Sequence, residues 1–165
     1  MDGFSVGIIT ISDKGSIGAR ADASGPVIRD IIKQAGGKVE KYVIVPDEKQ
    51  EIKEAIIDMS DSLRLNLILT TGGTGFSERD ITPEATMEVV EKCVPGIPEA
   101  MRAKSLLITP KAMLSRAQAG IRKGSLIINL PGSPKGAEEN LEAILPALKH
   151  GIEILTGRAS ECGEK

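Results

Sequence analysis

The sequence of 165 residues predicts one α/β domain with three layers, in which helices cover both faces of a mostly parallel sheet. Short apolar runs rich in Ile, Val and Leu alternate along the chain with segments whose apolar residues recur at helical spacing. Glycine, proline and small polar residues separate these segments, and several of the separating turns directly follow a predicted strand. No linker or internal repeat divides the chain, so we expect residues 1–165 to form a single domain with a core over residues 4–156.

The first strand is expected over Phe4–Ile11, because this run is apolar and the polar turn Ser12–Gly15 ends it. The first helix is expected to begin with Ser24 as its N-cap, because Pro26 follows in the first turn and isoleucines then recur at helical spacing. The pair Gly36–Gly37 should end that helix, since glycine adopts the backbone conformation that closes a helix.

A second strand and helix follow the same pattern. The strand is expected over Lys38–Val45 and ends at Pro46, and Asp47 with Gln50 has the spacing of a helix capping box. A third strand is expected over 65–70, directly before a glycine-rich turn. The order strand, helix, strand, helix, strand is typical of a parallel sheet with right-handed crossovers.

The next helix is expected to begin at Thr82 as its N-cap, with Pro83 in the first helical position. Pro95 and Pro98 break the chain there, and a short helix that runs through Leu106 is expected to follow.

The last part of the chain contains two predicted strands and one helix. The segment 114–121 is ambiguous, and we favour a strand over 117–121 because Gly120 is a poor helix residue. Residues 125–130 form a clearer apolar run. Ser133 and Pro134 have the spacing of a helix start, and Pro146 is a potential interruption of the helix that follows.

Composition excludes several classes of function. The net charge is -2 and aromatic residues make up 2% of the chain, so we expect no nucleic-acid partner. No apolar run has the length of a membrane span, and no signal peptide is recognisable, so we expect a cytoplasmic protein without a membrane partner. Cys93 and Cys162 fit no metal or redox spacing, and His150 is the only histidine, so neither a histidine metal site nor a Ser-His-Asp triad is expected.

Three loops are predicted to meet at one edge of the sheet. The loops 12–23, 71–81 and 129–134 each follow a strand and precede a helix, and Asp47 directly follows the second strand. In an open parallel sheet such loops lie at the carboxyl ends of the strands, where ligands bind. Residues that are far apart in the sequence are therefore expected to share one cleft.

The turn Thr71–Gly75 is the most distinctive of these loops. Glycine can adopt positive φ and lets main-chain N–H groups approach an anion, so phosphate is the expected ligand. The sequence after Gly75 lacks the Lys-Ser/Thr pair of a P-loop, and Glu78 occupies the last glycine position of a dinucleotide fingerprint. The alternative is a tight loop that only connects a strand to a helix.

Two carboxylates accompany this turn. Asp80 and Asp47 are candidate Mg²⁺ ligands, because a carboxylate beside bound phosphates requires a cation between them. Each has a structural alternative: Asp47 as a helix cap, and Asp80 as a loop residue that bonds its own backbone. The turn Asn129–Pro134 is a second candidate anion site, and Ser115 with Arg116 adds a hydroxyl and a cation suited to phosphate or a pterin carbonyl.

Together these residues resemble the molybdopterin adenylyltransferase family of molybdenum cofactor biosynthesis, which includes the amino-terminal domain of gephyrin. The resemblance extends in family order from residue 6 to about residue 150, and its most specific part is Gly-Gly-Thr-Gly followed by Arg-Asp-x-Thr-Pro-Glu. The matching segments are Thr10–Asp13, Pro46–Glu48, Thr70–Gly75, Arg79–Glu84, Pro95–Glu99, Leu114–Arg116 and Asn129–Gly132.

The resemblance implies a molybdopterin-binding-domain-like fold, usually a homotrimer, and a requirement for Mg²⁺. It implies that the terminal phosphate of molybdopterin attacks the α-phosphorus of ATP, giving adenylylated molybdopterin and pyrophosphate, and that a metal-insertion enzyme uses the product. It implies catalytic, metal-holding roles for Asp47 and Asp80. The residues that it implies for nucleotide and molybdopterin binding are Ser12, Asp13, Gly72, Gly73, Thr74, Gly75, Thr82, Glu84, Ser115, Arg116, Asn129, Pro131, Gly132 and Ser133.

Two other functions are alternatives to this one. A non-catalytic trimeric module that binds molybdopterin is the main alternative, although the presence of both Asp47 and Asp80 favours the enzyme. A nicotinamide-dependent oxidoreductase is disfavoured because the dinucleotide fingerprint fails. Molybdenum and tungsten are both compatible with the sequence as the metal that the pathway finally inserts.

Overall fold

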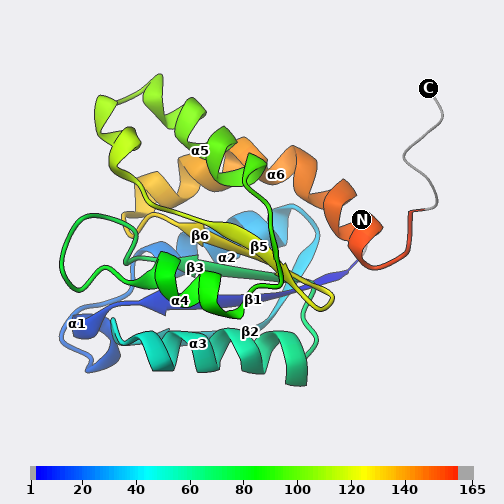
Figure 1. The fold of residues 1–165 in the computed structure, drawn as a ribbon, viewed down its shortest axis with the longest axis horizontal. Helices are drawn as coiled ribbons and strands as arrows, with labels where there is room; N and C mark the ends of the chain where they lie inside the picture. Colours follow the sequence, from blue (N-terminus) through cyan, green and yellow to red (C-terminus); the bar gives the residue numbers. More distant parts are fainter. Residues whose placement is uncertain (1–2, 160–165) are drawn as a thin grey trace.

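A computed structural model describes residues 3–159, which fold around a six-stranded sheet with the strand order β2-β1-β3-β6-β5-β4 (Figure 1). The strands β2, β1, β3 and β6 are parallel, whereas β5 and β4 run antiparallel at one edge. This arrangement confirms the predicted mostly parallel sheet. The strands are β1 (Phe4–Ile11), β2 (Gly37–Val45), β3 (Leu67–Thr71), β4 (Lys92–Cys93), β5 (Ala119–Arg122) and β6 (Ser125–Leu130).

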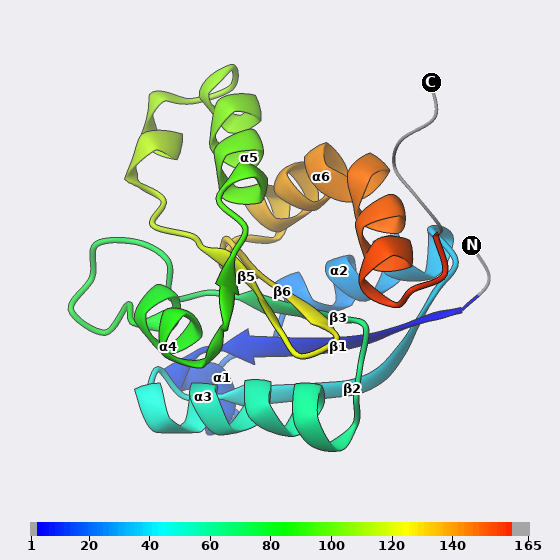
Figure 2. The ribbon, with the colours of Figure 1, turned by 45° about the vertical axis from the view of Figure 1, so that its right-hand side comes forward.

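Helices cover both faces of the sheet, as Figures 1 and 2 show. On one face, α2, α5 and α6 pack against inward residues such as Val6 and Ile8, and on the other face α3 and α4 pack against Ile9 and Ile68. The helical segments are α1 (Asp13–Ser16), α2 (Ser24–Gln34), α3 (Lys49–Ile57), the π-helical turn η1 (Asp58–Ser62), α4 (Thr82–Val89), α5 (Gly96–Leu106), the 3₁₀ turn η2 (Pro110–Leu114) and α6 (Pro134–Leu155). The three predicted layers are therefore present.

The central strands read as continuous apolar runs because they are covered on both sides. All five residues of β3 are buried, and neighbouring residues such as Leu67 and Ile68 belong to the cores on opposite faces. Strands buried on both faces lose the alternation of apolar and polar residues. Because β1, β3 and β6 are parallel, the loops that follow them lie at the same edge of the sheet.

Three predicted N-caps are wrong. The helix α2 already includes Ser24, and the carboxylate of Asp22 accepts the hydrogen bond from the N–H of Gly25 (3.1 Å). The helix α3 begins at Lys49 after Glu48, so Asp47 and Gln50 form no capping box. Thr82 is the first residue of α4, and its hydroxyl donates to the main-chain oxygen of Gly72 (2.9 Å).

The other predicted helix start is confirmed. Ser133 caps α6, where its hydroxyl accepts from the N–H of Gly136 (3.1 Å), and Pro134 occupies the first helical position. Pro146 does not divide this helix, which continues to Leu155. The potential interruption at Pro146 is therefore absent.

The antiparallel edge of the sheet differs most from the sequence prediction. The strand predicted over 117–121 begins two residues later, as β5, and forms a hairpin with β6 through Lys123 and Gly124. The two-residue strand β4 was not predicted. Within residues 3–159, no helix has both the length and the apolar composition that a membrane crossing requires. Cys93 is an exposed free thiol, whereas Cys162 lies outside the described residues.

Candidate functional site

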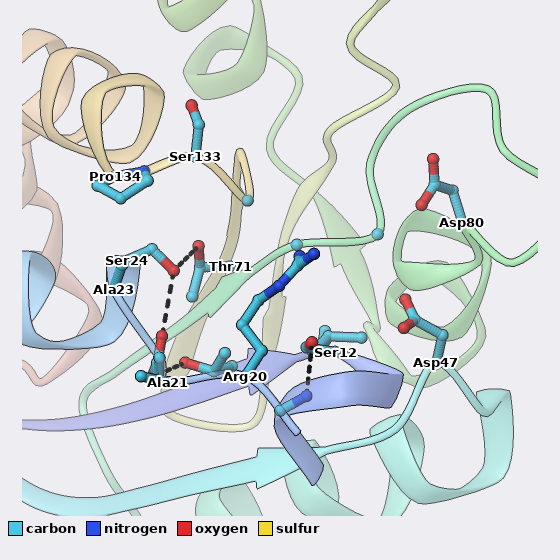
Figure 3. A pocket seen from close by; sticks show the side chains of 17 residues that line it. Ser12, Arg20, Ala21, Ala23, Ser24, Asp47, Thr71, Asp80, Ser133 and Pro134 are labelled. Carbon is cyan, nitrogen blue, oxygen red and sulfur yellow. Dashed lines mark hydrogen bonds between the residues drawn. The ribbon is translucent and has the colours of Figure 1, made fainter. Parts of the chain in front are cut away.

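A cleft of about 520 Å³ lies at the carboxyl ends of the parallel strands, as the loop positions predict. Its walls come from the loop after β1, from Asp47 after β2, from the glycine turn after β3 and from the start of α6 (Figure 3). Predicted residues that line this first cleft are Ser12, Asp47, Gly72, Gly73, Asp80, Gly132 and Ser133.

The glycine turn forms the floor of the first cleft, and two of its positions require glycine. Gly72 has φ +106° and Gly73 has φ +68°. A β-carbon on Gly72 would overlap the main-chain oxygen of Ile11, and one on Gly73 would overlap the hydroxyl of Thr82. That hydroxyl is fully buried and bonded to Gly72, so it has little freedom to move away.

The hydrogen bonds of this turn show which amides are available to a ligand. The N–H of Gly72 donates to the main-chain oxygen of Leu130 (3.2 Å), so this amide is already engaged within the protein. Within residues 3–159, the N–H groups of Gly73, Thr74 and Ser133 make no hydrogen bond. Unpaired main-chain donors at a glycine turn and at a helix start can together bind phosphate oxygens.

Asp47 and Asp13 are tied together by two reciprocal hydrogen bonds. The N–H of Asp13 donates to Oδ2 of Asp47 (2.9 Å), and the N–H of Asp47 donates to Oδ1 of Asp13 (3.0 Å). Arg79 also donates to Asp13, through Nε (3.0 Å) and a terminal nitrogen (2.8 Å), and to Glu48 (2.9 Å). These contacts connect the loops after β1, β2 and β3 and fix the position of the Asp47 carboxylate.

The two linked carboxyls have opposite pKa shifts. The hydrogen bond from Arg79 lowers the pKa of Asp13. Burial raises the pKa of Asp47, and the negative charges of Asp13 and Asp80 raise it further. A carboxylate that is partly buried near other carboxylates is stabilised by a cation. The electrostatics of the first cleft therefore favour a positively charged partner for Asp47.

Asp47 and Asp80 fit a divalent metal that is shared with a bound phosphate. Both carboxylates stand at the same side of the first cleft (Figure 3). Oδ2 of Asp80 accepts from the N–H of Ser77 (3.0 Å), while Oδ1 of each carboxylate accepts no hydrogen bond within residues 3–159. Within residues 3–159, no group of three or more His, Cys, Asp or Glu side chains is arranged to hold a metal ion by itself. The pair Asp47 and Asp80 suits Mg²⁺, which takes one or two carboxylates and completes its shell with phosphate oxygens and water.

A second cleft of about 310 Å³ adjoins the first and shares Ser133 with it. It is lined by the other predicted residues Thr74, Gly75, Ser115 and Pro131, and by residues of α5, η2 and α6. Ser105 of α5 lies in its wall, buried, with a hydroxyl that has no hydrogen-bond partner within residues 3–159. A buried polar atom without a partner is costly unless a ligand supplies one.

Five of the predicted binding residues line neither of these clefts. Asp13 and Thr82 make the contacts described above. The amide of Asn129 is fully buried, where it donates to the hydroxyls of Thr70 (3.0 Å) and Thr86 (2.9 Å). Arg116 pairs with Glu84 and donates to the main-chain oxygens of Gly75 and Asp80 (2.8 Å each). These side chains hold the loops in place.

Sequence reasoning missed several residues of the two clefts. Arg20 and Asp22 line the first cleft, and Arg102 and Ser105 line the second. Arg102 donates to the main-chain oxygens of Ser115 (3.2 Å) and Ala117 (3.0 Å), so it also supports the segment that carries Ser115. The loop 12–23 was expected at this edge, but no spacing rule distinguishes Arg20 or Asp22 from other loop residues.

A family described as "Probable molybdopterin binding domain" matches residues 7–150 of the chain. The chain belongs to this family. It is 42% identical over its full length to the molybdopterin adenylyltransferase of Helicobacter pylori strain J99, of which it covers 95%. It is 45% identical to the gephyrin of Dictyostelium discoideum over 93% of this chain but 23% of that protein.

Solved structures of the same family share the fold. The crystal structure of the molybdopterin biosynthesis enzyme MoaB from Thermus thermophilus matches with a TM-score of 0.89 and 50% identity, and the match covers 93% of this chain and 97% of that one. The resemblance inferred from the motifs is therefore confirmed at the level of sequence and of fold.

Proposed function

We propose that this protein transfers the adenylyl group of ATP to the terminal phosphate of molybdopterin and releases pyrophosphate. The observation that carries the proposal is the first cleft, where Asp47 and Asp80 face a glycine turn with unpaired N–H donors. The second cleft opens beside it and shares Ser133, so two ligands bound in the two clefts could meet at their phosphates. The names of the adenylyltransferase relatives support the same reaction.

In this proposal ATP occupies the first cleft. The N–H group of Gly73 and the start of α6 at Ser133 bind phosphate oxygens, since a helix N-terminus carries partial positive charge. Asp47 and Asp80 hold Mg²⁺, which neutralises negative charge on the phosphates when it is bound. The two hydrogen bonds between Asp13 and Asp47 keep the carboxylate of Asp47 in position.

Molybdopterin occupies the second cleft. The hydroxyls of Ser115 and Ser105 are suited to the polar edge of a pterin, and the half-buried Arg102 lies in the same wall. The pterin phosphate then lies toward Ser133, next to the α-phosphate of ATP. Holding two reactants in this geometry supplies most of what a phosphoryl-type transfer requires.

The proposed reaction needs no histidine base. An oxygen of the pterin phosphate attacks the α-phosphorus of ATP, and the bond between the α-phosphorus and the bridging oxygen to the β-phosphate breaks. The attacking phosphate is already ionised near neutral pH, so no proton has to be removed. In agreement with this, no histidine is among the residues that line the two clefts.

Pyrophosphate release from ATP, Mg²⁺ and molybdopterin tests the proposal. Asp80→Asn keeps the size of the side chain but removes its charge, and we expect it to abolish release while the protein stays folded. Asp58→Asn is the matched control, because Asp58 is exposed and follows α3 at the opposite edge of the sheet. Full activity of Asp80→Asn would refute the metal-holding role. Molybdopterin binding by the unaltered protein without any release would instead identify the non-catalytic binding module.

We further propose a homotrimer in the cytoplasm that hands its product to a metal-insertion enzyme. Exposed apolar side chains at the end of α5 and in η2, including Leu107 (81% exposed), Met113 (63%) and Ile108 (53%), support a subunit contact. The exposed thiol of Cys93 suits a reducing compartment. Light scattering on the unaltered protein and on Leu107→Lys tests the assembly, and a monomer in both would refute it.

A further inference from the structure

Arg20 holds a position in the first cleft that neither the motifs nor the family assignment explains. It lies in the loop between α1 and α2, and its side chain extends over the cleft toward the glycine turn (Figure 3). It is the only Lys or Arg among the residues that line this cleft. Its guanidinium makes no hydrogen bond or ion pair with any other residue in the described range 3–159.

The nearby carboxylates do not account for this cation. Asp22 accepts from the hydroxyl of Thr10 (2.7 Å) and the N–H of Gly25 (3.1 Å), so its oxygens are already engaged. Asp47 is bonded to the N–H of Asp13, and Asp80 to that of Ser77. The other arginine of this rim, Arg79, is paired with two carboxylates. Arg20 is thus the cation left available to an anionic ligand.

We propose that Arg20 is a catalytic residue whose guanidinium binds the β- and γ-phosphates of ATP and stabilises the charge that develops on the leaving pyrophosphate. This inference rests on the adenylyl transfer proposed above. Arginine presents a planar set of donors that matches adjacent phosphate oxygens, and it stays protonated throughout the reaction.

The arrangement of the two clefts points to the leaving group as the partner of Arg20. The attacking phosphate enters from the second cleft, past Ser133, whereas Arg20 lines only the first. In a displacement at phosphorus, the attacking and leaving oxygens lie roughly in line on opposite sides. The pyrophosphate therefore departs on the side of the first cleft that faces away from the second. Arg20 is exposed and lines the first cleft but not the second, which fits a position beside the leaving group.

Substitutions at Arg20 test the assignment, with ATP, pyrophosphate and AMP as separate probes. Arg20→Ala should lower kcat/KM for adenylyl transfer about 100-fold, the usual effect of removing one preorganised donor for developing charge. Arg20→Lys should lose about 10-fold, because it keeps the charge but not the paired donors. By calorimetry with Mg²⁺, Arg20→Ala should bind ATP and pyrophosphate more weakly and bind AMP as the unaltered protein does.

Arg158→Ala is the matched control. Arg158 is also exposed, but it follows the end of α6 that lies opposite the first cleft, roughly 33 Å along a helix of this length. Unchanged turnover and unchanged pyrophosphate affinity in Arg20→Ala would overturn the inference, and so would equal losses of AMP and ATP affinity. An unaltered protein that releases no pyrophosphate and does not bind ATP would refute the proposed function itself, which keeps the two failures distinct.

Discussion

Gly73→Ala should destabilise the protein, because two separate effects act at this position. The backbone of Gly73 has φ +68°, where a residue with a β-carbon costs about 1–2 kcal/mol. The new β-carbon would also displace the buried hydroxyl of Thr82 from its hydrogen bond to Gly72, which costs about 1–3 kcal/mol. Together these give a loss of about 3 kcal/mol, or about 6–12 °C in Tm for a domain of this size.

Urea unfolding of four proteins measures this effect and its cause: the unaltered chain, Gly73→Ala, Thr82→Ala and the double variant. If the overlap with Thr82 carries part of the cost, the double variant should lose about 1–2 kcal/mol less than the sum of the single changes. Gly124→Ala is the control, because a β-carbon there meets open space and its φ is not positive. Strictly additive losses, or a Gly73→Ala protein as stable as the control, would refute this account of the turn.

Three further predictions concern single side chains. An NMR titration should find the pKa of Asp47 above 3.8. Asp80→Asn should lower this pKa, because it removes a neighbouring negative charge; an unchanged pKa would contradict the interaction between the two carboxylates. Hydrogen bonds from two lysines lower the pKa of Glu88 from 4.5 to about 2. The difference in unfolding free energy between the unaltered protein and Glu88→Gln should therefore be present above pH 4.5 and disappear as the pH falls through 2. A difference that stays constant with pH would argue against these ion pairs. Asn129→Ala leaves two buried hydroxyls and one N–H unpaired, so thermal unfolding should reveal a loss of about 3 kcal/mol or more, against little change for the exposed Gln34→Ala.

The sheet and its functional edge could be predicted from the sequence, because strands that are buried in the core consist of apolar residues. Strands covered on both faces need uninterrupted apolar residues, and Ser125–Leu130 was predicted with its observed bounds for that reason. The edge strand at Lys92–Cys93 is exposed and two residues long, so no apolar run marks it. Its pairing with β5 depends on tertiary contacts that a local pattern does not contain.

The helix caps were less predictable, since one residue type serves several purposes. Thr82 and Asp47 have the composition of caps, but in the folded protein their oxygens bond to the glycine turn and to Asp13. These partners are 10 and 34 residues away in the chain. Arg20 was missed for a related reason: its proposed role depends on its having no partner within residues 3–159, and only the folded protein reveals that.

The direction of β1 and α6 has a practical consequence for how this domain can be joined to others. The strand β1 runs toward the clefts from Phe4, and α6 runs away from them to Leu155, so both ends of the core emerge at the opposite rim (Figures 1 and 2). A fusion partner, a surface tether or a purification handle attached at either end leaves the mouths of both clefts open. The same geometry is compatible with a segment of this kind lying within a much longer polypeptide, and this chain matches 23% of the length of the Dictyostelium discoideum gephyrin.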